Sequence, residues 1–261
     1  MIAATVAIGV FGLFHPQSLE IEPYGRARVE VRCGTATILE GNRRMRLSRD
    51  CTASGPNGAP VDFVLSVPGK IRRHYLGTLE TRKTGAEIFA IVTMSLETAV
   101  ASTVAAEAPT GAAKAMLEAQ AIVSRSYLSA HKRHRDFDFC DTTHCQFIKD
   151  PPSPESSAAR AAHATAGQVL LYRGQVVAAF YAARCGGLLA PLPAENVGDG
   201  DYPYFAVHCE YCARNPVKDA PKANARPHHH GMCQLGADDL AKQAWSTARI
   251  LAHYYPGTEL R

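Results

Sequence analysis

The chain has 261 residues, more than the roughly 100–200 residues of a common single domain, so we expect one elaborated domain or two closely joined ones. Apolar residues make up 46% of the chain and charged residues 20%, a composition typical of a soluble globular protein, which excludes long disordered stretches. The net charge of +4 is small and spread along the chain, so it gives no sign of a nucleic-acid partner.

The first fourteen residues are almost wholly apolar. They lack the basic segment of a signal peptide and are shorter than the roughly 20 residues that span a bilayer. Val6, Ile8 and Val10 alternate with small residues, which predicts a first β-strand. We therefore expect any export signal or anchor to have been trimmed from the chain given.

Eight cysteines are many for a cytosolic protein of this size. Cys33 and Cys51 lie in a polar, strand-like context without a neighbouring histidine, which favours a disulfide between them. Disulfides persist in oxidising compartments, so the sequence predicts an exported protein of the cell envelope or the medium.

Up to about residue 100 the sequence predicts a β-rich region. Its short runs of Val, Ile and Thr are separated by turn signals such as Pro56-Asn57-Gly58 and Thr84-Gly85. From about residue 112 the spacing of Leu117, Ala121 and Leu128 changes to a helical period, and this helix is expected to end near Lys132. The fold class predicted is therefore α+β, with a β-rich N-terminal part followed by a mixed α/β core.

The second half of the chain is expected to alternate loops with short elements. The predicted segments are a polar loop at 133–150, an Ala-rich helix near 156–166, a hairpin of 168–172 with 175–182, functional loops at 186–235, and a last helix at 237–253.

The polar loop carries a dense cluster of side chains that can bind a metal. His134, Cys140, His144 and Cys145 are spaced H-x5-C-x3-H-C, and two thiolates with two imidazoles would complete a tetrahedral zinc site. The alternative is a disulfide or two free thiols with surface histidines. Because the protein would fill all four positions, we expect the zinc to be structural.

A second group of cysteines lies near the C-terminus. Cys209-x2-Cys212, with His208 before it and His228, His229, His230 and Cys233 after it, is compatible with another metal site. In an exported protein, however, Cys185 needs a partner. A disulfide from Cys185 to Cys209 or Cys212 is the favoured interpretation.

Glu107 lies among small apolar residues just ahead of the long helix. An apolar setting raises the pKa of a carboxyl group, as a general acid that works near neutral pH requires. On local composition alone, Glu97 and Glu118 are equally available acids.

Several ordered motifs from about residue 70 onward resemble the SpoIID/LytB family, whose members act on bacterial peptidoglycan. The family's Glu-x-Pro and its following A-Q-A-V-A-A-R-T-Y are similar, at the same distance, to Glu107-Ala108-Pro109 and to 119–127. Its C-D-T-T-H-C-Q matches 140–146 letter for letter, and its F-Y-x-x-x-C-G-G matches 180–187. Its G-M-S-Q-x-G-A resembles 231–237.

The resemblance implies two regions, an N-terminal β-rich region at 1–70 and a SpoIID-like catalytic domain at 71–261, expected to pack as one unit. It implies a lytic transglycosylase that cleaves the bond between N-acetylmuramic acid and N-acetylglucosamine in peptide-stripped glycan strands and leaves 1,6-anhydro ends. Glu107 would be the single catalytic acid and base. The family's zinc ligands fall on His134, Cys140, His144 and Cys145. Positions expected to line the groove are Gln120, Arg125, Tyr181, His228 and Gln234.

The chain departs from the family pattern at three places. Ala112-Ala113 replaces the usual Trp-Pro, Cys233 replaces the serine of G-M-S-Q, and Pro227 with His228, His229 and His230 replaces G-H-G-V. We therefore expect a changed groove.

Two other functions remain open from the sequence. The first is a wall-binding modifier that is not itself catalytic and stimulates an N-acetylmuramoyl-L-alanine amidase. The second is ordinary glycan hydrolysis, which needs two carboxylates, with Glu97, Asp136 or Asp138 as the second. In each case the expected partners are peptidoglycan glycan strands, and other cell-wall hydrolases are candidates.

Overall fold

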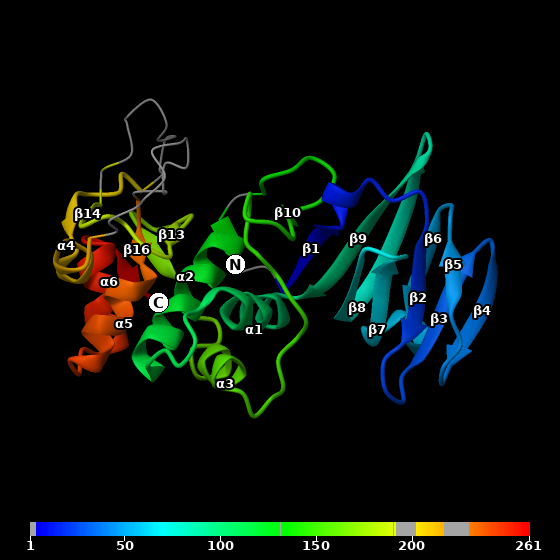
Figure 1. Ribbon diagram of the computed structural model, residues 1–261, viewed down its shortest axis with the longest axis horizontal. Helices are drawn as coiled ribbons and strands as arrows, with labels where there is room; N and C mark the ends of the chain where they lie inside the picture. Colours follow the sequence, from blue (N-terminus) through cyan, green and yellow to red (C-terminus); the bar gives the residue numbers. More distant parts are fainter. Residues whose placement is uncertain (1–3, 131, 190, 192–201, 217–229) are drawn as a thin grey trace. The chain divides into compact units, whose positions relative to one another are not determined.

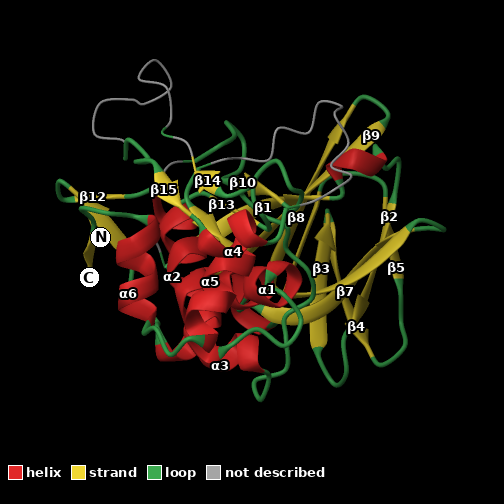
Figure 2. Cartoon of the chain, turned by 60° about the vertical axis from the view of Figure 1, so that its left-hand side comes forward, coloured by secondary structure: helices red, strands yellow, loops and turns green. Residues whose placement is uncertain are grey.

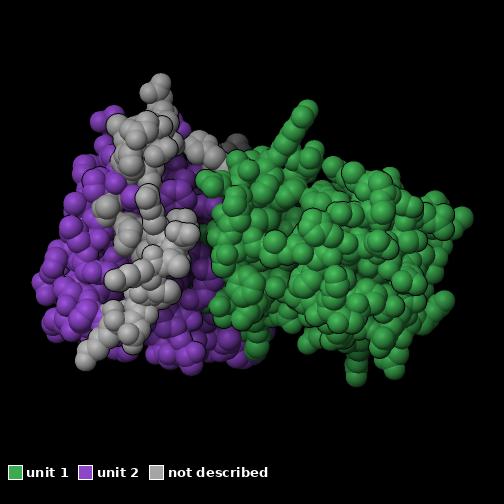
Figure 3. Space-filling model, turned by 45° about the horizontal axis from the view of Figure 1, so that its top comes forward, with its two compact units in different colours: residues 1, 3–106, 132–153 green, residues 2, 107–131, 154–261 purple. Residues whose placement is uncertain are grey.

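The computed structural model describes residues 4–130, 132–189, 191, 202–216 and 230–261. The chain divides into two compact units, coloured separately in Figure 3. Unit 1 comprises Ala3–Ala106 and Lys132–Ser153, and unit 2 comprises Glu107–His131 and Pro154–Arg261. The fold is α+β, as predicted, with strands dominating the N-terminal region and helices following it (Figures 1 and 2).

Unit 1 is built on a ten-stranded sheet in the order β10-β1-β9-β8-β6-β3-β4, with β2, β5 and β7 joined through β8. The long strand β8 connects β2, β5 and β7 to the main series of strands, because its first half pairs with β7 and its second half with β9. The strands are β1 (Thr5–Val10), β2 (Leu19–Pro23), β3 (Arg28–Cys33), β4 (Thr35–Glu40), β5 (Met45–Leu47), β6 (Cys51–Ser54), β7 (Val61–Val67), β8 (Ile71–Thr84), β9 (Glu87–Ser95) and β10 (Phe139–Cys140). Two short 3-10 helices, η1 (Gly12–Phe14) and η2 (Pro56–Gly58), lie between strands.

The alternation at the start of the chain has the predicted result. β1 pairs antiparallel with β9, and Val6, Ile8 and Val10 are each at most 2% exposed. Apolar side chains at every second position therefore place β1 in the core of the sheet.

The disulfide predicted between Cys33 and Cys51 is present and joins the end of β3 to the start of β6. Replacing both cysteines by alanine is expected to lower the free energy of unfolding by roughly 3 kcal/mol, because the bond closes a short loop and restricts the unfolded chain. Urea unfolding of the double variant beside the parent protein measures this loss. An unchanged midpoint and slope would mean that the bond contributes nothing to stability.

Residues 96–107 correct the prediction of strands up to about residue 100. They form the helix α1 (Leu96–Glu107). Its buried side chains include β-branched residues that are common in strands, so no polar stripe marks the helical period. The Ser95 hydroxyl accepts a hydrogen bond from the Thr98 amide at 3.0 Å, which is the N-cap that begins the helix.

Unit 2 is organised around the long helix α2 (Lys114–Ala130), which was predicted from its period. Most residues of α2 are buried, because α3 (Ser157–Ala164), α5 (Gln234–Lys242) and α6 (Thr247–Tyr254) all pack against it. The short helix α4 (Glu210–Arg214) packs against α5. The small strands of this unit are β11 (Leu170–Tyr172), β12 (Gln175–Val176), β13 (Tyr181–Ala182), β14 (Leu188–Leu189), β15 (Val207–His208), β16 (Met232–Cys233) and β17 (Glu259–Leu260).

Two predictions in unit 2 need correction. The expected hairpin forms only between β11 and β12, whereas β13 pairs in parallel with β16 from the far end of the chain. The single helix predicted at 237–253 is two helices, α5 and α6. They are separated at Ala244, whose φ of 63° is incompatible with a continuous helix, and the Ser246 side chain caps the second one.

The predicted division at residue 70 differs from the division into units. β7 and β8 form a hairpin across that position, within unit 1. The division into 1–70 and 71–261 was based on the extent of the family resemblance. It stays a prediction. Among the described residues, no helix has the length and apolar character needed to cross a membrane.

Candidate functional site

Glu107 is the last residue of α1 and is half-buried. The hydroxyl of Tyr181, on β13, is buried beside it. Burial is the main reason why the pKa of Tyr181 lies well above its ordinary value. The charge of Glu107 raises this pKa further, whereas a hydrogen bond with the Ser124 hydroxyl lowers it. The phenol therefore stays protonated at neutral pH. A hydrogen bond between the phenol and the Glu107 side chain also contributes to the raised pKa of Tyr181.

Two buried amides connect Glu107 to the rest of unit 2. The Gln234 side chain donates from Nε2 to the main-chain oxygen of Glu107 and to Oε1 of Gln120, at 3.1 Å each. Gln120 in turn donates to the Ser124 hydroxyl at 3.1 Å. These bonds fix the position of the Glu107 main chain. The structure therefore brings together four of the residues predicted for the site: Glu107, Gln120, Tyr181 and Gln234.

Ser124 belongs to this group but was not singled out from the sequence. It lies four residues after Gln120, so both side chains project from the same face of α2. Two polar residues at this spacing in an otherwise buried helix were the signal that could have identified it.

Arg125 lies elsewhere, although it was predicted to line the groove. Its side chain is fully buried, and its guanidinium donates to the main-chain oxygens of Ala162 at 3.0 Å and Gln168 at 3.1 Å. Ala162 is in the last turn of α3, where carbonyl groups lack partners within the helix and a positive charge is favourable. This position favours a structural role for Arg125 over the predicted contact with substrate.

The other two acids considered from the sequence, Glu118 and Glu97, lie in different surroundings. Glu118 bonds to the Thr247 hydroxyl at 2.6 Å and pairs with Lys114 at 3.5 Å, so it is held within a structural contact. Glu97 is in the first turn of α1, at the end opposite Glu107. His228 lies outside the described residues.

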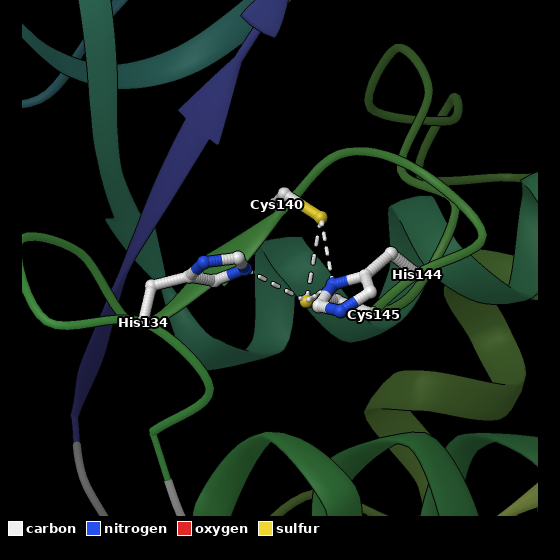
Figure 4. Close-up of side chains that lie close together, drawn as sticks. All are labelled: His134, Cys140, His144 and Cys145. Atoms are coloured by element: carbon white, nitrogen blue, oxygen red, sulfur yellow. Dashed lines mark hydrogen bonds between the residues drawn. The ribbon is translucent and has the colours of Figure 1, made fainter. Parts of the chain in front are cut away.

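The four predicted metal ligands converge in unit 1 (Figure 4). The Sγ atoms of Cys140 and Cys145 are 3.4 Å apart, Nδ1 of His144 is 3.7 and 3.5 Å from them, and Nε2 of His134 is 3.3 Å from Cys145 Sγ. For zinc bound at ordinary distances in a tetrahedron, neighbouring sulfurs would be about 3.8 Å apart and a sulfur and a nitrogen about 3.6 Å apart. The spacing of these atoms therefore fits a tetrahedral metal ion.

The sheet holds the loop that carries these ligands. β10 pairs in parallel with β1, which places Cys140 opposite Gly9. The carboxylate of Asp141 forms a buried ion pair with Arg73 of β8 at 2.6 Å. Burial raises the pKa of Asp141, and Arg73 opposes this shift. The strand pairing and the ion pair thus anchor the loop at Cys140 and at Asp141.

The protonation of the ligands suits metal uptake coupled to proton release. Burial, followed by the charges of His144 and Arg133, lowers the pKa of His134, so its ring is neutral and can act as a ligand. Burial raises the pKa of the Cys145 thiol, so an entering cation must displace that proton.

A metal ion held by this group would lose one of its thiolate ligands when Cys145 is replaced by serine, so this variant is expected to contain about one equivalent of metal less than the parent and to have a lower thermal midpoint. Elemental analysis and a melting curve measure both effects. The exposed His163 on α3 gives a matched control, because His163→Ala should change neither. Equal metal content in parent and Cys145→Ser would exclude a metal at this cluster.

The disulfide favoured for Cys185 is wrong. None of Cys185, Cys209, Cys212 and Cys233 is disulfide-bonded; all are buried, and their sulfurs lie within 4.8 Å of one another. The described part of the chain thus has two groups of side chains that could hold a metal ion: two cysteines with two histidines in unit 1, and four cysteines in unit 2.

Comparison with known families supports the interpretation of the motifs. Residues 84–172 match the family described as SpoIID, Stage II sporulation protein. The matched segment contains Glu107, Gln120, Arg125 and the four ligands of unit 1, while Tyr181 and Gln234 lie beyond it. No curated protein matches the chain. The match of residues 84–172 supports the resemblance to the SpoIID family and suggests a function related to sporulation or the cell wall.

Proposed function

We propose that this protein is a peptidoglycan lytic transglycosylase with Glu107 as its single general acid and base. The observation that carries the proposal is the half-buried carboxyl group of Glu107 beside a buried phenol, on a main chain that Gln234 holds in place. The match to the SpoIID family, which is associated with this activity, supports the same function.

The chemistry needs one carboxyl group. Protonated Glu107 gives its proton to the glycosidic oxygen as the bond from that oxygen to the muramic acid C1 breaks. The C6 hydroxyl of the same muramic acid then attacks C1, and the Glu107 carboxylate takes the hydroxyl proton. The products are a 1,6-anhydro end and a free hydroxyl on the leaving sugar, and Glu107 is protonated again. The Tyr181 phenol would donate a hydrogen bond to the carboxylate in its charged state.

Hydrolysis would require a second carboxylate to activate water or to form a glycosyl intermediate. Asp138, one candidate for that role, accepts a hydrogen bond from the Ala7 amide at 2.9 Å and pairs with Lys132 at 2.6 Å. A carboxylate that anchors the loop in this way is poorly suited to activate water. This supports the one-carboxylate mechanism.

We further propose that the ligand group of unit 1 holds one structural zinc ion. The set of two thiolates and two imidazoles is typical of zinc, and four protein ligands leave no position for water or substrate. The ion would stabilise the loop 133–150 and take no part in bond cleavage. Its donors belong to residues on either side of the Asp141–Arg73 ion pair, so metal and ion pair would fix the same turn.

We also propose that the protein is exported and acts on the glycan strands of the cell wall, alone or beside other wall hydrolases. The Cys33–Cys51 disulfide supports an oxidising compartment. Fractionation of cells, followed by detection of the oxidised protein, tests this location.

Mass spectrometry of peptide-stripped glycan strands after digestion tests the proposed activity. The transglycosylase gives 1,6-anhydro ends, whereas a hydrolase gives reducing ends. An intact glycan polymer, together with faster release of peptides by an added amidase from peptidoglycan that still carries its peptides, would support a wall-binding modifier and contradict the proposal.

A further inference from the structure

Four cysteines from distant parts of unit 2 meet in its core. Cys185 follows β13, Cys209 and Cys212 flank the start of α4, and Cys233 ends β16 (Figure 1 labels these elements). Each of these four side chains is at most 2% exposed, and their four sulfur atoms all lie within 4.8 Å of one another. Four buried thiols of this kind require an explanation, because nothing in the proposed glycan chemistry uses them.

The spacing of the sulfurs favours a metal over disulfides. Bonded sulfurs lie about 2.05 Å apart, whereas thiolates around a tetrahedral zinc ion lie about 3.8 Å apart. The Sγ atoms of Cys212 and Cys233 are 3.5 Å apart, and none of the four cysteines is disulfide-bonded, whereas Cys33 and Cys51 are. The group is arranged as a cluster of four rather than as two pairs.

The backbone around the cluster has the form of two opposed turns. β14 pairs with β15, and the amide of Cys209 donates to the main-chain oxygen of Gly187 at 2.8 Å, which brings the turn after Cys185 against the Cys209-x2-Cys212 turn. A two-residue spacing between cysteines at such a turn is typical of zinc sites. β13 pairs in parallel with β16 and brings Cys233 to the other side.

Contacts to the sulfurs are those expected of thiolates. The amide of Gly236 donates to Cys233 Sγ at 3.4 Å, and the Tyr254 hydroxyl lies 3.8 Å from Cys209 Sγ. Donors of this kind compensate negative charge on sulfur. A side chain at Gly236 would collide with this arrangement, since a Cβ atom there would lie 2.6 Å from Cys209 Sγ.

We propose that Cys185, Cys209, Cys212 and Cys233 bind a second metal ion, a structural zinc held by four thiolates. Four protein ligands close the coordination sphere, and the complete burial of the group excludes a role in substrate binding. The site also explains how an exported protein keeps four thiols that would otherwise oxidise.

The position of the site gives it a consequence for Glu107. Cys233 directly precedes Gln234, whose amide bonds to the main-chain oxygen of Glu107 and to Gln120. Cys233 is also the N-cap of α5, so an ion bound there would fix the beginning of that helix. The second site would therefore hold Gln234 in position without taking part in chemistry.

Metal content and thiol content of the full-length protein test the proposal without reference to glycan cleavage. Elemental analysis of protein purified without reductant is expected to find about two equivalents of zinc. The Cys140→Ser, Cys145→Ser double variant should keep about one equivalent, and the Cys209→Ser, Cys212→Ser double variant should lose one. Alkylation in denaturant with a chelator, read by mass, should modify all six cysteines that lie outside the disulfide.

A variant that lacks Cys209 and Cys212 is at risk of not folding, so a second measurement uses the intact cluster. Cobalt added to the metal-free Cys140→Ser, Cys145→Ser variant should give the strong sulfur-to-cobalt absorption of a tetrahedral thiolate site. A Cys140→Ser, Cys145→Ser variant without bound zinc or that absorption, or alkylation of only two cysteines because the other four are disulfide-bonded, would overturn the proposal.

Discussion

Glutamine in place of Glu107 is expected to lower the rate of glycan cleavage by about 10²–10⁴-fold, the usual contribution of general acid and base catalysis. The glutamine side chain has nearly the same size, but it can neither give a proton to the glycosidic oxygen nor take one from the C6 hydroxyl. Because the groups that hold the backbone here bond to the main-chain oxygen of Glu107, the substitution leaves that contact in place. We expect kcat to fall with KM nearly unchanged, as measured by the initial rate of release of anhydro ends.

Glu118→Gln is the matched control for this experiment. Glu118 is an acid of the same unit whose carboxylate is bonded to Thr247, so its loss is expected to reduce stability slightly and to leave the rate within about twofold of the parent. If Glu107→Gln cleaved glycan as fast as the parent protein, the assignment of the catalytic residue would be wrong.

Replacing Arg125 by methionine is expected to lower the free energy of unfolding by about 3 kcal/mol or more. A buried carbonyl group that loses its donor costs about 1–3 kcal/mol, and Arg125 donates to the buried carbonyl of Ala162 and to the half-buried carbonyl of Gln168. The change also removes a positive charge near the C-terminal end of α3. Urea unfolding followed by circular dichroism measures the loss as a lower midpoint at an unchanged slope.

Two variants sharpen this prediction. Arg160→Met removes an exposed arginine from the same helix α3 and should change stability by less than about 0.5 kcal/mol. Arg125→Lys keeps the charge but lacks the planar fork that reaches two carbonyl groups, so an intermediate loss is expected. An Arg125→Met variant that unfolded like the parent but bound glycan weakly would return Arg125 to the substrate-binding role predicted from the motif.

The sequence predicted correctly those parts of the fold that depend on the spacing of residues close together in the chain. β1 and α2 were found because one face of each is apolar at the period of a strand or a helix. The ligand group of unit 1 was found because all four residues lie within twelve positions of one another. In these cases, residues near in sequence carry the information.

The sequence was misleading where long-range packing decides the structure. The helix α1 is buried around much of its surface, so it lacks the polar face that would have revealed its period. The break between α5 and α6 falls at Ala244, a residue type that gives no signal of a positive φ. Cys185 was assigned to a disulfide because nothing local indicates that β14 with β15, and β13 with β16, bring three other thiols to it.

The candidate site shows the same limit. The family motif led to the prediction that Arg125 lines the groove, but a motif does not tell in which direction a side chain points. The Arg125 side chain bonds to the main chain of Ala162 in α3 and of Gln168. Tyr181 and Gln234 reach the neighbourhood of Glu107 only because β13 and β16 pair in parallel across about fifty residues. The neighbours of Glu107 therefore follow from the topology of the chain.

Digestion of peptide-stripped glycan in water enriched in ¹⁸O tests the central claim most directly. If the C6 hydroxyl of the sugar is the nucleophile, the new ends are 1,6-anhydro sugars, lighter than reducing ends by one water and free of ¹⁸O. Reducing ends that carry ¹⁸O would show that water attacks C1, and this result would contradict a lytic transglycosylase with Glu107 as its only acid and base.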